Sequence, residues 1–79
     1  MNPHYGIVIA SDDKHEKVVA EIYFDDLFIA LLSQEEGLDK LVLELPGVGM
    51  NEALILRRIP MTEFQHMLIL AAKELALKR

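Results

Sequence analysis

The chain contains no cysteine and no tryptophan, and it has few glycines and prolines. The missing cysteine excludes disulfides, thiolate metal sites and cysteine nucleophiles, and it favours a cytoplasmic location. Only four glycines and three prolines accompany 52% hydrophobic residues, which is not the composition of a disordered chain. The sequence therefore predicts a folded cytoplasmic protein.

Long hydrophobic runs are missing as well. The longest uninterrupted apolar runs, Leu27–Leu32 and Met67–Ala72, have six residues each, whereas a helix that spans a bilayer needs roughly 18. The amino terminus has no basic stretch followed by an apolar segment, so we expect no secretory signal and no membrane association. The 79 residues are enough for a single domain, residues 1–79.

Positive charge is the scarcer of the two signs. Eight lysines and arginines stand against thirteen aspartates and glutamates, which gives a net charge of −5. This balance disfavours contact with a nucleic-acid backbone, because the phosphates are themselves negative. A basic protein surface is the better electrostatic match. The composition therefore predicts no nucleic-acid binding and favours a basic protein partner.

The first two thirds of the chain have the residue pattern of short β-strands. Asp25–Asp26 stands between two apolar runs, at the spacing of a two-residue hairpin turn. Pro60 ends the strand-like region. The strands are expected over residues 6–11, 17–24, 27–32, 40–45 and 53–59.

A helix is expected after Pro60, because Thr62 and Gln65 have the spacing of a capping box. We place it from about Glu63 to near the carboxyl terminus. Its apolar stripe, which should cover the sheet, consists of Phe64, Met67, Leu68, Ala71, Ala72 and Leu75. The predicted fold is α+β: an antiparallel sheet of four to five strands in a β-meander, with one C-terminal helix packed on a face.

Two apolar surfaces predict a homodimer. The rear of the helix carries leucine and isoleucine where an ordinary surface helix carries charge, and residues 27–32 are apolar on both faces although one helix covers only one face of a sheet. The alternative is that these are incidental surface residues, which are common. The candidate dimer interface consists of Ile69, Leu70, Leu77, Leu27 and Ile29.

Acidic residues gather at one end of the predicted meander, where the loops after the first and third strands meet. Asp12 and Asp13 lie in one loop, and Glu35 and Glu36 in the other. We predict that these four residues form an acidic patch that binds a basic partner. A solvated loop end and an oxygen-ligand site for Ca²⁺ or Mg²⁺ are the alternatives, although no Asp-x-Asp-x-Asp-Gly loop is present.

No set of residues converges on a catalytic centre. Ser11, Asp12 and His15 have the residue types of a nucleophilic triad, but one tight loop holds all three. We therefore predict no catalytic residue, no cofactor and no metal.

The leading functional hypothesis is a small acidic non-enzymatic interaction module, such as an inhibitor, an immunity-type protein or an adaptor. The alternative is a small-ligand-binding protein or small enzyme. Its pocket would lie between helix and sheet or at the dimer seam, with Glu21, Glu44, Tyr23 or His66 as its polar groups.

Overall fold

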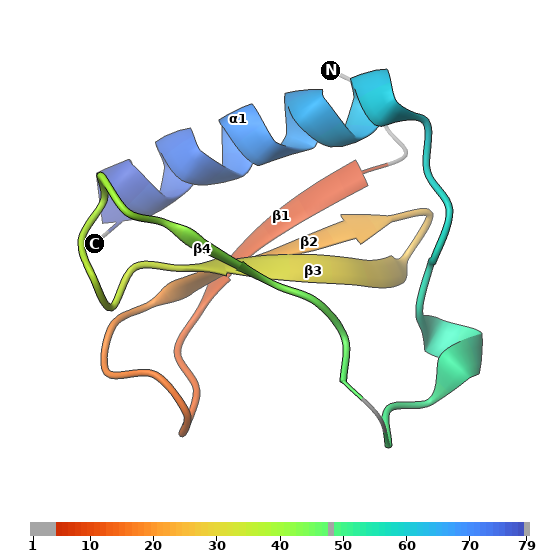
Figure 1. Ribbon diagram of the computed structural model, residues 1–79, viewed down its shortest axis with the longest axis horizontal. Helices are drawn as coiled ribbons and strands as arrows, with labels where there is room; N and C mark the ends of the chain where they lie inside the picture. The colour runs from red at the N-terminus through yellow and green to blue at the C-terminus, as the bar shows by residue number, and fades with distance from the viewer. Residues whose placement is uncertain (1–4, 48, 79) are drawn as a thin grey trace.

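The computed structural model describes residues 5–47 and 49–78 of the chain. It shows a four-stranded antiparallel meander with a single long helix, α1, lying across one face (Figure 1). This is the α+β fold that the sequence predicts. The elements are β1 Tyr5–Ala10, β2 Val19–Phe24, β3 Leu27–Ser33, β4 Val42–Glu44, the short 3-10 helix η1 Glu52–Leu54, and α1 Met61–Lys78, and the strands neighbour one another in chain order.

The turn between β2 and β3 confirms the predicted two-residue hairpin. Asp25 and Asp26 have φ angles of 51° and 66°, both in the left-handed region. Two such residues in succession make a type I′ turn, whose twist matches that of the flanking strands. Phe24 and Leu27 close the hairpin as the first register pair. Aspartate adopts a left-handed conformation at both turn positions, where asparagine and glycine are more common.

A β-bulge in β3 places Ile29 in the core. The register shifts between Ile22, which pairs with Ala30, and Tyr23, which pairs with Phe28, so that Ile29 is the extra residue. Its side chain is only 6% exposed and belongs to the cluster beneath α1. The sequence predicts Ile29 in a dimer interface, but the bulge places its side chain beneath α1. It therefore has almost no surface to offer a second copy of the chain.

The helix begins earlier than the sequence predicts. It starts at Met61, so Thr62 lies inside the helix and is not its capping residue. The first helical hydrogen bond runs from the Phe64 amide to the Pro60 carbonyl over 3.0 Å. Proline is tolerated at this boundary because the first helical amides have no carbonyl partner in any case. Within the described residues, no helix combines the length and the hydropathy needed to cross a bilayer.

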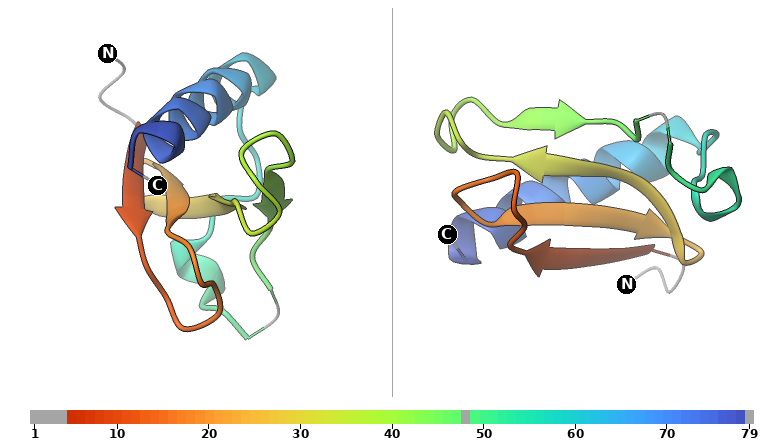
Figure 2. Two further views of the ribbon diagram at one scale, coloured as in Figure 1. Left: turned by 90° about the vertical axis from the view of Figure 1, so that its left-hand side faces the viewer. Right: turned by 90° about the horizontal axis from the view of Figure 1, so that it is seen from below.

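The predicted apolar stripe of α1 is confirmed. Met67, Ala71 and Leu75 are fully buried, and they pack on β1 and β2, so α1 covers one half of the sheet (Figure 2). Phe64, Leu68 and Ala72 pack around the same cluster. The buried core comprises Ala20, Ile22, Ile29, Ala30, Leu32, Met67, Ala71 and Leu75.

The strand expected over residues 53–59 is not present. Asn51 caps η1 instead, accepting a hydrogen bond from the Ala53 amide over 3.0 Å. This turn reverses the chain after β4, and Ile55 then forms one isolated parallel bridge with Phe28. The Leu56 amide donates to the Phe28 carbonyl over 2.9 Å. β4 pairs only with residues 31–33, so this bridge contacts the outer edge of β3 at Phe28, a residue that β4 does not reach.

Candidate functional site, an acidic groove on the helix-free face

The sheet face opposite α1 carries two projecting segments. Figure 1 shows the β1–β2 loop and the segment from β4 to η1 extending away from the helix, and Figure 2 shows the strands between them from that side. The two segments flank a groove of about 670 Å³ that is open to solvent. We call this space the acidic groove. It is lined by Asp12, Asp13, Lys14, His15, Glu21, Tyr23, Asp26, Phe28, Leu31, Glu44, Leu45, Pro46, Gly47, Met50, Asn51 and Leu54.

The floor of the acidic groove is set by strand register. Glu21 pairs with Leu31, and Leu31 pairs with Glu44, so the three side chains form one row across β2, β3 and β4. Register partners point to the same face of a sheet. Tyr23 and Phe28 form the next row, and their rings meet edge to face with centroids 5.6 Å apart. The floor therefore combines two carboxylates with an apolar and aromatic surface.

Glu21 is held in place by Tyr23. The Tyr23 hydroxyl donates to Glu21 Oε1 over 2.9 Å, between side chains that are both half-buried. Burial raises the pKa of Tyr23 above its ordinary value, and the hydrogen bond to the Glu21 carboxylate raises it further. A carboxylate has about four lone-pair sites, so Glu21 keeps capacity for a second donor.

His15 joins the β1–β2 loop to β4. Its Nδ1 lies 2.8 Å from Asp12 Oδ1, and its Nε2 lies 2.7 Å from Glu44 Oε2. Because neutral imidazole carries one N–H, only protonated His15 can donate to both carboxylates. The hydrogen bond to Glu44 and then that to Asp12 raise the pKa of His15. His15 in turn lowers the pKa of Glu44 and of Asp12.

The contacts of His15 with Asp12 and Glu44 also argue against a nucleophilic triad of Ser11, Asp12 and His15. Carboxylates occupy both ring nitrogens of His15, so neither nitrogen is left to accept a proton from the Ser11 hydroxyl. Within the described residues, no group of three or more side chains has the arrangement of a metal site.

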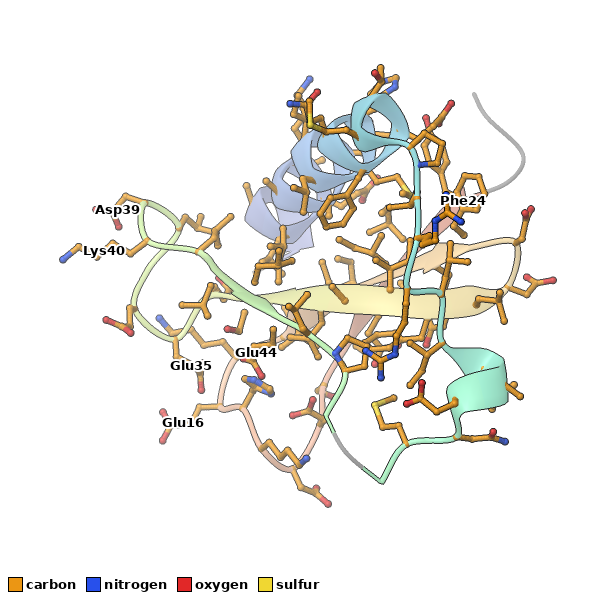
Figure 3. The ribbon with its side chains drawn as sticks, turned by 45° about the vertical axis from the view of Figure 1, so that its right-hand side comes forward. Glu16, Phe24, Glu35, Asp39, Lys40 and Glu44 are labelled. Carbon is orange, nitrogen blue, oxygen red and sulfur yellow. The ribbon has the colours of Figure 1, made fainter. Side chains whose placement is uncertain are left out.

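The four residues of the predicted acidic patch have different positions. Asp12 and Asp13 line the acidic groove. Glu35 instead fastens the β1–β2 loop, because its carboxylate accepts hydrogen bonds from the amides of Glu16, over 2.6 Å, and Lys17, over 3.1 Å (Figure 3). Glu36 is exposed and lies outside the groove lining.

Three residues named for the alternative pocket, Glu21, Tyr23 and Glu44, come together in the acidic groove. The groove is on the helix-free face, not between helix and sheet. The fourth, His66, lies elsewhere, with its Nδ1 3.4 Å from the Tyr5 hydroxyl. Asp26 was not predicted to belong to a site, although the hairpin turn that brings it to the groove was predicted.

The electrostatic character of the groove is strongly one-sided. Five of its lining side chains are carboxylates, Asp12, Asp13, Glu21, Asp26 and Glu44, and its basic side chains are Lys14 and His15. Glu21 and Glu44 are half-buried, where water screens a charge less than it does at an exposed position. The groove is therefore suited to a cationic ligand.

The candidate dimer residues lie apart from this site. Ile69 and Leu77, on the outer side of α1, are 55% and 79% exposed. Leu70 and Leu27 are half-buried. Phe28 and Leu31 are also half-buried, so the helix-free face of β3 receives partial cover within one chain.

Comparison with known proteins gives no independent indication of function. No family model, no curated protein and no solved structure matches the chain at a significant level. Function is therefore inferred from the chemistry of the groove.

Proposed function

We propose that this protein is a non-enzymatic interaction module that binds a basic surface of another protein through its acidic groove. The observation that carries the proposal is the gathering of five carboxylates around one open groove, with Lys14 and His15 as its basic side chains. An inhibitor, an immunity-type protein and an adaptor would all use such a groove to cover a basic surface. We place this activity in the cytoplasm, in keeping with the absence of cysteine.

Charge supports a protein partner over a nucleic acid. The net charge of −5 and the acidic groove both repel phosphate. Complementary charge accelerates association with a basic surface and disfavours acidic competitors. Because the Debye length is about 10 Å at 0.1 M salt, binding should weaken as salt is added.

A nine-residue peptide of alternating arginine and glycine tests the proposal. Amide resonances of the ¹⁵N-labelled protein should shift saturably at groove residues such as Glu21 and Leu31, and the shifts should diminish when salt is raised above about 0.1 M. Shifts distributed equally over exposed acidic residues outside the groove, such as Glu36 and Glu74, would contradict it.

A small cationic ligand is a second candidate for the same groove. It is favoured by the meeting of Glu21, Tyr23 and Glu44 on one floor, since small-molecule sites combine an apolar surface with a few convergent polar groups. A free amine or guanidinium compound would then bind as tightly as any peptide that carries the same group.

We also propose that two copies of the chain associate through the outer side of α1. The support is the exposure of Ile69 and Leu77 on one helix, because an exposed apolar surface is a frequent feature of interfaces. The solution mass tests this part of the proposal.

A further inference from the structure

We infer that the basic partner inserts an arginine side chain into the acidic groove, above Leu31 and between Glu21 and Glu44. This inference rests on the proposed function and specifies which group of the partner is recognised. It follows from the spacing of the two carboxylates, the aromatic row beside them and the size of the groove.

The spacing of Glu21 and Glu44 suits a guanidinium group. Both are register partners of Leu31, so their backbones are two strand spacings apart, about 10 Å, and their side chains rise on the same face. A cation placed above Leu31 therefore lies between the two carboxylates. Guanidinium has five N–H donors in a planar fork and can donate to acceptors on two sides at once, which a lysine ammonium does less well.

Each carboxylate keeps acceptor capacity for this contact. One oxygen of Glu21 accepts from Tyr23, and Glu44 contacts His15 through Oε2 and accepts a further hydrogen bond from Ser33. These contacts fix the carboxylates in position while leaving lone pairs on both groups. Because the carboxylates are held before the ligand arrives, binding costs less side-chain entropy than it would at two flexible surface glutamates.

The neighbouring row supplies the apolar part of the site. Tyr23 and Phe28 lie directly beside the Glu21–Leu31 pair, and their edge-to-face arrangement leaves ring surface at the groove floor. Arginine stacks its guanidinium plane on aromatic faces and packs its alkyl stem on aliphatic side chains. Leu31, Phe28 and Tyr23 provide both kinds of surface.

The remaining space indicates a protein segment as the source of the guanidinium. At about 670 Å³ the groove has the size of a pocket for a drug-sized ligand, which is more than one side chain fills. Beyond the carboxylates, its wall carries the exposed side chains of Leu45, Met50 and Leu54. We therefore expect apolar residues beside the arginine, packing on this wall.

Blocked pentapeptides test the inference: acetyl-Gly-Leu-Arg-Leu-Gly-amide, and the same peptide with citrulline or lysine in place of arginine. Binding is measured from amide shifts of the ¹⁵N-labelled protein. The arginine peptide should saturate with a Kd of about 1 mM or lower. The uncharged citrulline peptide should bind at least about tenfold more weakly, and the lysine peptide should fall between them.

Glu21→Gln provides the site-specific variant, because glutamine can still accept from Tyr23 and the fold should be kept. It should weaken arginine-peptide binding about five- to tenfold. Glu74→Gln, which makes the same change of charge on α1, should change it less than about twofold. Thermal unfolding of both variants verifies that each remains folded.

Three results would overturn the inference. Equal binding of the citrulline and arginine peptides would show that the groove does not read charge. Equal effects of Glu21→Gln and Glu74→Gln would place arginine elsewhere. Butylguanidinium reproduces the arginine side chain without a peptide. If it bound as tightly as the arginine peptide, the ligand would be identified as a small molecule. If the arginine–glycine peptide still maps to the groove in either of the first two cases, the proposed function stands and the arginine site alone fails. In the third case the protein partner is replaced by the small cationic ligand.

Discussion

At the scale of single residues, His15 connects the wall of the groove to its floor. It is 8% exposed and stands between Asp12, in the wall, and Glu44, on the floor. Its charge therefore decides whether both contacts can be hydrogen bonds.

The pH dependence of stability should report this contact. Because the pKa of His15 is raised above 6.5, its contribution is fully present below about pH 6.5 and is lost as pH rises through the raised value. The pKa values of Asp12 and Glu44 are lowered from 3.8 and 4.5, so their contributions are present above those values and are lost as pH falls through the lowered ones. The wild-type protein should therefore have a larger free energy of unfolding in urea than the His15→Gln variant, and this difference should be greatest between about pH 5 and 6.5. Parallel profiles of wild type and variant from pH 5 to about 9 would contradict this.

At the scale of elements, the hairpin turn between β2 and β3 gives a clean test of backbone conformation. Asp26 has a φ of 66°, where a Cβ atom is unfavourable and glycine is not. Asp26→Gly and Asp26→Ala remove the same charge, so their difference isolates the backbone effect. The glycine variant should be more stable by about 1 kcal/mol, and its Tm should be higher by about 4–8 °C in calorimetry. Equal Tm values would show that the turn does not require this conformation.

The two faces of α1 should respond differently to truncation. Met67 is fully buried, so Met67→Ala should lower the free energy of unfolding by about 2–5 kcal/mol. Ile69 is 55% exposed, and in a monomer Ile69→Ala should cost less than about 0.5 kcal/mol. A larger cost for Ile69→Ala that grows with protein concentration is expected if the outer side of α1 is a dimer interface. Urea titrations at two concentrations measure both effects.

The fold could be predicted from local patterns where these were unambiguous. The apolar stripe of α1 and the turn at Asp25–Asp26 follow from spacing along the chain, and the structure bears out both. The strand expected over residues 53–59 failed because the apolar alternation of Leu54 and Leu56 does not reveal the turn capped by Asn51. Residues that alternate can also belong to a chain reversal that makes a single bridge.

The candidate site was harder to predict because it depends on contacts between distant segments. Glu21 and Glu44 share a floor through the register of three strands. The tie between His15 and Glu44 joins residues that are 29 positions apart. Sequence placed Asp12 and Asp13 near Glu35 and Glu36, but it could not show that Glu35 is used to fasten a loop.

At the scale of the whole molecule, the dimer prediction depends on the apolar surface that one copy of the chain leaves exposed. The loops give partial cover to Phe28 and Leu31, which removes one reason for a dimer. Ile69 and Leu77 remain exposed on α1.

Light scattering should therefore give a mass of about 18 kDa, twice the 9.0 kDa of one chain. The double variant Ile69→Lys/Leu77→Lys should have the mass of a single chain. A wild-type mass of 9.0 kDa at high concentration would show that the two side chains are ordinary surface residues.

The most direct test of the account compares two variants of equal net charge in binding the arginine–glycine peptide. Asp13→Asn/Asp26→Asn removes two carboxylates from the groove, whereas Asp39→Asn/Glu74→Gln removes two from outside its lining. Figure 3 shows Asp39 at the tip of the β3–β4 turn, away from the groove. The account predicts that the groove variant loses at least about fivefold in affinity and the other less than about twofold. Equal losses would show that the peptide responds to net charge alone and that the groove is not the binding site.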